Sequence, residues 1–287
     1  MSLVKFEIFH TVASMGSLTK AGEKLNLTQS AVSHAISGLE KDLGFSLLTR
    51  NRSGLKVTSD GERILQYIRE ILRLHEIMLQ EAASIKGLEI GTVKIGTFTS
   101  VSTRWLPEII KQFQKNYPGI TLELYDGNYT KIEQWLTEGE IDCGFVNHVK
   151  SNSFDIVPLK KDRLLCIVSE QNILSAQERI SFKQIEAEPF IMPRYGNEHD
   201  VKRIFREHKV KPNIKLELTD DRTIMAMVQH NFGISIMPEM ILENLPENVK
   251  TIALEKDCFR SIGIATTYQM SPATKKFIDT VKNWLGE

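Results

Sequence analysis

The sequence predicts a multi-domain α+β protein with an N-terminal winged helix-turn-helix, a long linker helix and a C-terminal α/β domain of two lobes. Three observations carry this prediction. Apolar residues recur at helical spacing before residue 58, a seven-residue repeat runs through residues 59–87, and strands alternate with helices from residue 91 onward. A chain of 287 residues is long enough for two or three domains.

The composition is that of an ordinary globular protein. Hydrophobic residues make up 41% of the chain and charged residues 25%, which excludes a mainly disordered chain. The 36 basic and 36 acidic residues balance, which argues against a protein that coats nucleic acid over its whole surface. Charge can still be local, and residues 1–60 carry a small basic excess, so a DNA-binding domain there stays compatible with the composition.

Cysteine usage and the N-terminus point to the cytoplasm. Cys143, Cys166 and Cys258 lie far apart in the sequence, so they suggest neither a disulfide framework nor a metal site. The N-terminal segment lacks the apolar core of a signal peptide, and no run of 18 apolar residues occurs. We therefore expect no membrane partner and no bound metal.

Residues 1–58 are expected to form the winged helix-turn-helix. Phe6, Phe9 and Val12 mark a first helix, and Ser17 starts a short second one. Thr28 can cap a third helix over residues 29–43, which Gly44 would end. Two helices joined by a turn of three or four residues make the helix-turn-helix pattern.

The third helix has one apolar face and one small polar face. Val32, Ile36 and Leu39 lie on the apolar face, and the opposite face carries no acid. A small, acid-free face suits close approach to phosphates and base edges, whereas an ordinary solvated helix that happens to be rich in Ser is the alternative. The predicted DNA-contacting residues of this segment are Thr28, Gln29, Ser30, Ser33, His34 and Ser37.

A basic hairpin is expected directly after this helix. Ser53–Gly54 reads as a turn between two short extended segments, and Arg50, Arg52 and Lys56 cluster around it. Seen alone, the segment could be an ordinary solvated turn. Following a helix-turn-helix, it is better explained as a wing that contacts the sugar-phosphate backbone.

Residues 59–87 predict one long helix that pairs with the same helix of a second chain. Apolar residues repeat at intervals of seven, which indicates a seam between helices rather than a helix lying on a globule. An isolated helix of this kind is marginally stable in water, so it needs a partner. The residues assigned to this homodimer seam are Ile64, Ile68, Ile71, Leu72, Met78, Leu79 and Ile85.

From residue 91 to residue 287, the sequence predicts an α/β domain with mostly parallel sheets. Strands are expected at 92–98, 120–125, 141–146, 156–159, 164–169, 190–192, 214–218, 234–237 and 261–265, and helices at 105–116, 130–137, 198–209, 222–230 and 272–285. The two groups of strands suggest lobe I at about 91–161 and 267–287, and lobe II at about 162–266. Ligands of such folds bind at the carboxyl ends of strands, between lobes.

These three sections, in this order, resemble a LysR-type transcriptional regulator along essentially the whole chain. The most specific motif runs from Gly16-Ser17-Leu18-Thr19-x-Ala21 through Leu25-Asn26-Leu27-Thr28-Gln29-Ser30-Ala31-Val32-Ser33 to Leu55-x-Val57-Thr58-x-x-Gly61. Weaker markers follow, among them Gly139-x-x-Asp142 and Gly233-Ile234-Ser235-Ile236-Met237-Pro238. The resemblance implies a C-terminal domain like a periplasmic binding protein and a homotetramer that binds and bends promoter DNA.

The expected effector site lies at the turns that join strands to helices in the C-terminal domain. The hydroxyl-rich turn after the first strand is where the family holds its coinducer, and Thr97, Thr99 and Ser100 match it most directly. A helix N-terminus there would favour a small anion, although simple helix capping is the alternative. The other candidates, placed from the strand ends, are Asn128, Thr130, Asn147, His148, Arg194 and Tyr195.

The function predicted from these features is sequence-specific DNA binding that regulates transcription under the control of a small, anionic effector. The expected partners are promoter DNA, the effector and further copies of the chain, with RNA polymerase as a further candidate partner. No catalytic residue or cofactor is predicted, since GxSxG, HExxH and GxxxxGK[ST] motifs do not occur. The alternative is a cytoplasmic solute-binding α/β protein with an incidental helical N-terminal domain.

Overall fold

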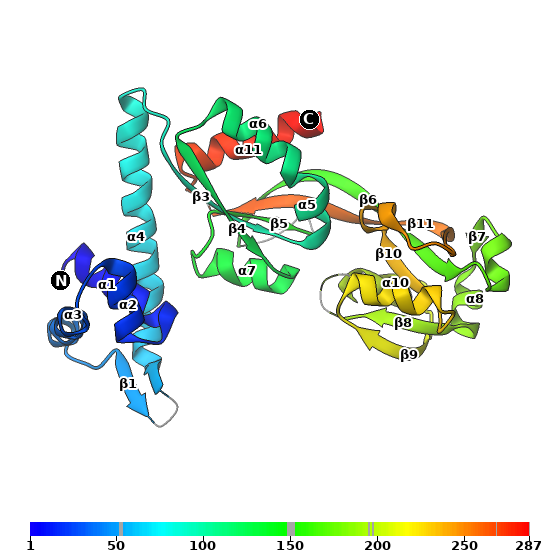
Figure 1. Ribbon diagram of the computed structural model, residues 1–287, viewed down its shortest axis with the longest axis horizontal. Helices are drawn as coiled ribbons and strands as arrows, with labels where there is room; N and C mark the ends of the chain where they lie inside the picture. Colours follow the sequence, from blue (N-terminus) through cyan, green and yellow to red (C-terminus); the bar gives the residue numbers. More distant parts are fainter. Residues whose placement is uncertain (52–53, 148–152, 195, 197, 268, 287) are drawn as a thin grey trace. The chain divides into compact units, whose positions relative to one another are not determined.

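Three helices open the chain, and the second and third begin at the side chains expected to cap them. They are α1 (Leu3–Met15), α2 (Leu18–Leu25) and α3 (Gln29–Leu43). The hydroxyls of Ser17 and Thr28 accept the N–H groups of Lys20 and Ala31, which satisfies donors that have no partner within the helix. The computed structural model describes residues 1–51, 54–147, 153–194, 196, 198–267 and 269–286 (Figure 1).

The chain divides into two units. We call Met1–Glu89 with Glu138–Glu140 the N-terminal unit, and Ile90–Thr137 with Ile141–Glu287 the C-terminal unit. None of the helices that the structure describes is both long and apolar enough to cross a membrane.

A tight turn joins α2 to α3. Asn26 adopts the left-handed conformation with φ 56°, and the Leu27 N–H donates to the Gly22 carbonyl at 2.8 Å. A Cβ on Gly22 would lie 2.7 Å from the Leu27 carbonyl oxygen, so only glycine lets the backbone approach this closely. The predicted helix-turn-helix is confirmed in these elements.

Hydrogen bonds between side chains and the backbone fix the wing to α3 and the start of the long helix to the loop that follows α3. The wing is the antiparallel pair β1 (Leu48–Asn51) and β2 (Gly54–Val57), and α4 spans Ser59–Ile85. The Glu40 carboxylate of α3 accepts the N–H groups of Leu47 at 2.7 Å and Leu48 at 3.2 Å. The Thr58 hydroxyl donates to the Ser46 carbonyl at 2.9 Å and accepts the Gly61 N–H, which caps α4 against the same loop.

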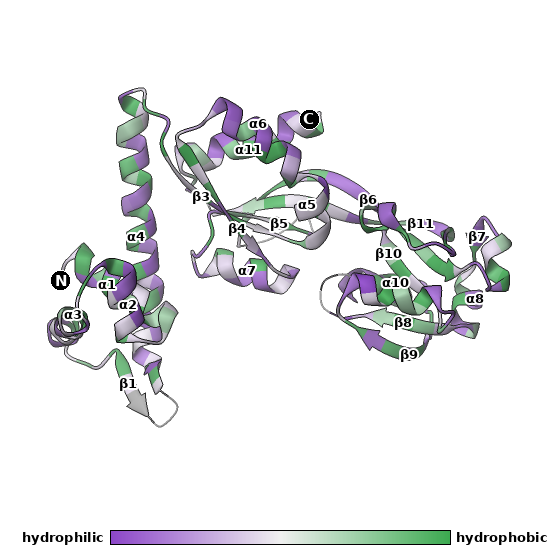
Figure 2. Cartoon of the chain, in the orientation of Figure 1, coloured by the Kyte–Doolittle hydropathy of each residue, from purple (hydrophilic) through white to green (hydrophobic). Residues whose placement is uncertain are grey.

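The core of the N-terminal unit includes the start of α4. Leu65 and Ile68 are each 2% exposed and pack with apolar residues of α1–α3, while Ile64 and Leu72 lie partly buried at its edge. Ile68 was expected at the dimer seam, but it is buried within its own chain. The remaining seam candidates, Ile71, Met78, Leu79 and Ile85, are exposed on α4. Figure 2 shows hydrophobic and hydrophilic segments alternating along this helix.

The C-terminal unit is built on a seven-stranded sheet with the order β10-β6-β11-β5-β3-β4, and β7 pairs with β11. In lobe I, α6 and α11 cover one face and α7 covers the other (Figure 1). The lobe I elements are β3 (Gly91–Thr97), α5 (Thr99–Arg104), α6 (Leu106–Asn116), β4 (Ile120–Asp126), α7 (Tyr129–Thr137), β5 (Cys143–Val146) and α11 (Pro272–Leu285).

Two long strands, β6 (Asp155–Ser169) and β11 (Val249–Thr266), run through both lobes. The other elements of lobe II are η1 (Ile173–Ala176), β7 (Arg179–Ile180), α8 (Phe182–Ala187), β8 (Pro189–Pro193), α9 (Glu198–Glu207), β9 (Asn213–Leu218), α10 (Asp221–Gln229), β10 (Ser235–Pro238) and η2 (Glu239–Asn244). A second, two-stranded parallel sheet of β8 and β9 lies in this lobe.

The continuity of β6 and β11 corrects two expectations. Both strands pair antiparallel to each other, so the main sheet is mixed rather than mostly parallel. The charged run at 160–163 interrupts the apolar pattern of β6, which is why the sequence predicted two strands there. Ile262 and Ile264 were assigned to lobe II, but they pack in the core of lobe I because β11 has already crossed at Arg260.

We expect Gly61→Ala to destabilise the N-terminal unit by about 1–3 kcal/mol, because the added Cβ overpacks the start of α4. That atom would lie 2.4 Å from the Leu47 carbonyl oxygen and 2.7 Å from a Val57 methyl group. Urea unfolding followed by circular dichroism measures the change.

Gly38→Ala is the matched control, since Gly38 also lies in a helix but faces only the flexible end of Lys5. It should stabilise the protein by up to about 1 kcal/mol, as alanine does in a helix interior. Equal free energies of unfolding for the two variants would contradict the close packing at Gly61.

Candidate functional site

The exposed face of α3 carries the residues that the sequence assigned to DNA. Gln29, Ser30, His34 and Ser37 are exposed, and Ser33 is half-buried beside the wing. Thr28 lies at the start of this face, where its hydroxyl caps α3 and shares a 3.0 Å hydrogen bond with that of Ser30. These side chains are short and carry no negative charge, so a polyanion can come close to the helix.

The wing lies next to α3 in the sequence and is held to it by Glu40. Lys56 is exposed on β2, opposite Thr49 in the register of the hairpin. Arg50 is paired with Leu55 through its backbone in β1, and its side chain lies outside the described structure, as does the whole of Arg52. The described part of the wing therefore places one of the three predicted cations on the surface.

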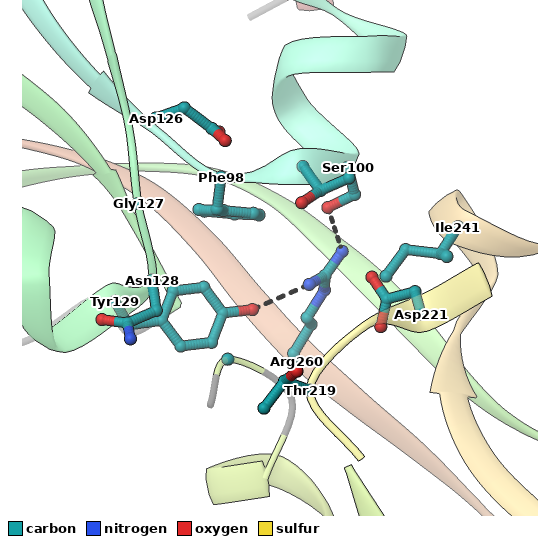
Figure 3. A pocket seen from close by; sticks show the side chains of 12 residues that line it. Phe98, Ser100, Asp126, Gly127, Asn128, Tyr129, Thr219, Asp221, Ile241 and Arg260 are labelled. Carbon is teal, nitrogen blue, oxygen red and sulfur yellow. Dashed lines mark hydrogen bonds between the residues drawn. The ribbon is translucent and has the colours of Figure 1, made fainter. Parts of the chain in front are cut away.

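A cavity of about 170 Å³ opens where the two lobes of the C-terminal unit meet (Figure 3). Lobe I supplies the start of α5 and the turn before α7, while lobe II supplies residues near the starts of α9, α10 and η2. The lining consists of Phe98, Thr99, Ser100, Asp126, Gly127, Asn128, Tyr129, Gly196, Thr219, Asp221, Ile241 and Arg260.

Arg260 is the central residue of this site. Its side chain is 1% exposed, and it lies opposite Asp162 in the register of β11 and β6. The guanidinium donates to the Asp162 carboxylate from Nε at 2.8 Å and from Nη2 at 2.6 Å. It also donates to the Tyr129 hydroxyl at 2.8 Å and to the Ser100 hydroxyl at 2.7 Å. The ring of Phe98 lies 5.4 Å from the guanidinium carbon.

The surroundings of Arg260 shift the pKa values of two groups that line the cavity. Burial raises the pKa of Tyr129 to about 12, although the neighbouring Arg260 opposes this shift, so the phenol keeps its proton at neutral pH. Burial also raises the pKa of Asp221 to about 6; Arg260 opposes this increase and Asp220 adds to it. The charge of the Asp221 carboxyl therefore changes near physiological pH.

The structure brings together three of the predicted effector residues. Thr99, Ser100 and Asn128 line the cavity, and the Asn128 side chain also caps α7 by accepting the Lys131 N–H at 2.9 Å. Ser100 has its hydroxyl directed at Arg260 rather than at a free helix end.

The other candidates lie outside the lining or outside the described residues. Thr97 is buried and bonds to Ser102, and Thr130 is exposed on α7. Asn147 donates to Asp200 at 3.4 Å, and Arg194 pairs with Glu217 of its own lobe. His148 and Tyr195 fall among the residues that are not described.

Sequence reasoning missed Arg260, Tyr129 and Asp221. One signal was present, because Arg260 directly precedes the apolar run 261–265 and a charged residue at the edge of a buried strand needs a partner. Its partner, Asp162, lies 98 residues earlier in the chain, so no local spacing could reveal the pair.

We expect Asp221→Asn to raise stability at pH 7.5 by up to roughly 3 kcal/mol, the free-energy equivalent of a pKa that rises from 3.8 to about 6. The folded state disfavours the ionised form, so the cost is present above pH 6 and disappears as the pH falls toward 4. Urea unfolding of both proteins between pH 4 and 8 measures the difference.

Asp220→Asn provides the control of opposite sign. Hydrogen bonds from the Thr223 hydroxyl and N–H lower the pKa of Asp220, so its charged form favours folding. This variant should be less stable than the wild type by a nearly constant amount above about pH 4, and the difference should shrink as the pH falls through the lowered pKa of Asp220. A constant difference between Asp221→Asn and the wild type at every pH would contradict the assignment.

Comparison with known proteins identifies both units. Residues 3–62 match the family model of the bacterial regulatory helix-turn-helix protein, lysR family, and residues 86–286 match the LysR substrate binding domain. The chain is 34% identical over 291 residues to the HTH-type transcriptional regulator YvbU of Bacillus subtilis (strain 168). This alignment covers 100% of the chain and 99% of that relative.

Solved structures share the fold. Full-length CbnR in complex with its target DNA has a TM-score of 0.68 at 21% identity, covering 99% of this chain and 100% of that one. The effector binding domain of QuiR in complex with shikimate has a TM-score of 0.63 at 23% identity, covering 69% of this chain and 98% of that one. The chain belongs to the LysR family of bacterial helix-turn-helix transcriptional regulators.

Proposed function

We propose that this protein regulates transcription by binding promoter DNA through α3 and the wing, and that a small effector in the Arg260 cavity changes the DNA-bound assembly. The observation that carries the DNA-binding part is the exposed, acid-free face of α3 next to a basic hairpin. The complex of CbnR with its target DNA supports the same role for this fold.

In this proposal α3 lies in the major groove and reads base edges from its N-terminal end. Gln29 is exposed in the first turn of α3, and a glutamine side chain can donate to and accept from adenine at the same time. Lys56, with Arg50 and Arg52 as further candidates, binds phosphates and positions the helix without reading sequence.

The protein assembles through the exposed apolar face of α4. Ile71 is 41% exposed, Leu74 39%, Met78 57% and Ile85 85%, and they follow one another at intervals of three, four and seven residues. Side chains of this size rarely form a contiguous stripe on a surface that stays in water. The same face of a second chain fits the stripe, and a symmetric dimer then presents two α3 helices to DNA. We propose a homotetramer built from two such dimers.

The effector acts by favouring one arrangement of the assembly. A ligand shifts an equilibrium only through its different affinities for the two states, so it must contact groups whose positions differ between them. The Arg260 cavity suits this role because both lobes line it. The effector complex of QuiR supports a ligand at this domain, and whether the ligand is an anion stays a prediction.

We propose a regulatory role rather than catalysis, and a regulator of promoter DNA would act in the cytoplasm.

A solute-binding protein with an incidental helical domain is the alternative. That alternative predicts ligand binding without sequence-specific DNA binding. A site selected by this protein from a randomised DNA pool, and then tested by gel shift against a scrambled site, distinguishes the two.

We expect Gln29→Ala to weaken binding to the selected site by about 1–3 kcal/mol and to leave binding to the scrambled site nearly unchanged. Gln66→Ala is the matched control, because Gln66 is also exposed but lies on α4. Fluorescence anisotropy on both DNAs measures the affinities. Equal losses on both DNAs would place Gln29 at the backbone instead of a base.

We expect Ile71→Asp to dissociate the dimer at micromolar concentration, because a carboxylate in an apolar seam costs several kcal/mol unless it is paired. Gln66→Asp introduces the same charge on an exposed polar position of α4 and should leave the dimer intact. Sedimentation velocity separates the species. A fully assembled Ile71→Asp protein would mean that the main interface lies elsewhere.

A further inference from the structure

The two hydroxyls that contact Arg260 keep their protons for a further acceptor. A guanidinium can only donate, so the oxygens of Ser100 and Tyr129 both act as acceptors in their bonds to it. Both side chains line the cavity and are buried, with 1% exposure for Ser100 and 4% for Tyr129. Among the residues that the structure describes, neither hydroxyl donates to an acceptor of the protein. The cavity therefore offers two O–H donors that a ligand can use (Figure 3).

The turn that precedes α7 adds a further donor and an acceptor to the same cavity. The side-chain oxygen of Asn128 caps α7, and its amide nitrogen donates to none of the described residues. The Asp126 carboxylate is exposed, and its one hydrogen bond from a described residue is a long one of 3.4 Å from the Ser102 hydroxyl. It can therefore accept from a ligand. Donors and an acceptor thus line one small space.

The charge of Arg260 is already compensated within the protein. Its guanidinium bonds to the Asp162 carboxylate, and its charge also acts on Asp221. Burial nevertheless raises the pKa of Asp221 to about 6, and burial likewise raises the pKa of Asp200, although Arg260 opposes both shifts. The surroundings of Arg260 thus favour the uncharged form of an acid, and the carboxylate of a ligand would meet the same burial.

We propose that the effector is a small neutral molecule with several hydroxyl groups, a polyol or a sugar, which accepts from Ser100 and Tyr129 and donates to Asp126. This proposal rests on the effector site proposed above and names its ligand class. A hydroxyl group donates one hydrogen bond and accepts two, so a set of hydroxyls satisfies both kinds of group in the lining without adding charge. The cavity of about 170 Å³ is close to the ~150 Å³ that accommodates a benzene-sized molecule, so a ligand of about three to five carbon atoms fits it.

A neutral ligand differs from the anion that the sequence led us to expect. That expectation took the hydroxyl-rich turn as the free N-terminus of a helix. In the structure, α5 at this turn has six residues, and the Ser100 hydroxyl binds the cation of Arg260 instead. Comparison of a neutral ligand with its own carboxylic acid separates the two expectations.

The first test measures whether a neutral ligand binds better than its charged counterpart. The full-length protein is titrated with glycerol, erythritol, threitol, xylitol, ribose, arabinose and xylose, and each molecule that binds is compared with the carboxylic acid made by oxidising one of its terminal carbons. Binding raises the melting temperature, and calorimetry gives the affinity. We expect at least one neutral molecule to bind with a Kd below about 10 mM, and its acid to bind at least about tenfold more weakly, since the acid adds a charge that burial disfavours.

Two results would overturn the proposal. One is an acid that binds as tightly as its neutral parent, or more tightly. The other is the failure of every neutral molecule of this set to bind at about 10 mM. Gel shift on the selected DNA site without ligand separates these failures from a failure of the proposed function. If DNA binding persists and a carboxylate alters it, the effector site stands and a neutral effector is excluded.

The second test assigns the donors. Tyr129→Phe and Ser100→Ala each remove one O–H group, so each should weaken binding of the neutral ligand by about threefold or more, the effect of one hydrogen bond. Thr130→Ala removes an exposed hydroxyl outside the lining and should leave the affinity unchanged. Polyols also stabilise proteins because they are excluded from the protein surface, and this general effect would be equal in every variant. Equal affinity in the wild type and in both lining variants would overturn the assignment of the donors.

Asp126→Asn separates a neutral ligand from an anionic one by the sign of its effect. Loss of the charged acceptor should weaken binding of the polyol or sugar by about tenfold or more, whereas an anion would bind more tightly once the nearby negative charge is gone. The variant should keep its fold, because Asp126 is exposed. Asp155→Asn, at an exposed carboxylate of β6 outside the lining, is the control and should change neither affinity. Equal or tighter binding of the neutral ligand by Asp126→Asn would overturn the assignment of Asp126 as its acceptor.

Discussion

The buried pair of Arg260 and Asp162 is the interaction on which the C-terminal unit depends. The two residues face each other on β11 and β6, at the point where the strands leave the core of one lobe and enter that of the other. An ion pair this deeply buried loses the hydration of both charges, and it persists only if further hydrogen bonds satisfy its polar atoms. Ser100 and Tyr129 supply two of these bonds from lobe I, and the Met240 N–H of η2 supplies a third to Asp162.

The same contacts connect the cavity to the place where β6 and β11 pass from one lobe to the other. Ser100, Tyr129 and Arg260 line the space where an effector would bind, and they also hold the crossing strands to lobe I. A ligand that bonds to these hydroxyls therefore acts on the groups that set the relation between the lobes. Packed interiors do not deform continuously, so such a ligand favours one discrete arrangement over another. The proposed effector thus acts on the assembly through the arrangement of the two lobes, and no separate element is needed to transmit the signal.

In the N-terminal unit, a few hydrogen bonds likewise hold several elements together. Glu40 holds the first residues of the wing to α3, and Thr58 and Gly61 hold the start of α4 to the same loop. Helix α3, the wing and the first turns of α4 consequently form one packed body with Leu65 and Ile68 in its core. The exposed apolar face begins only after this anchored segment, so the first turns of α4 pack within the chain and the later turns carry the face that we propose for the dimer.

Much of this protein follows from its sequence alone. Caps such as Ser17 and Thr28, the left-handed Asn26 and the periodic apolar faces act between residues that are close in the chain, so the helix-turn-helix, the long helix and the alternation of strands and helices could be predicted. Ser100 and Asn128 were found because they lie at predicted turns from a strand to a helix. Only the tertiary structure decided that Asp162 and Arg260 pair, that β6 and β11 run unbroken through both lobes, and that Ile68 is a core residue. A buried charge is stabilised by partners that the fold brings from distant parts of the chain, and the side of a helix that meets its own domain depends on packing that no local pattern encodes.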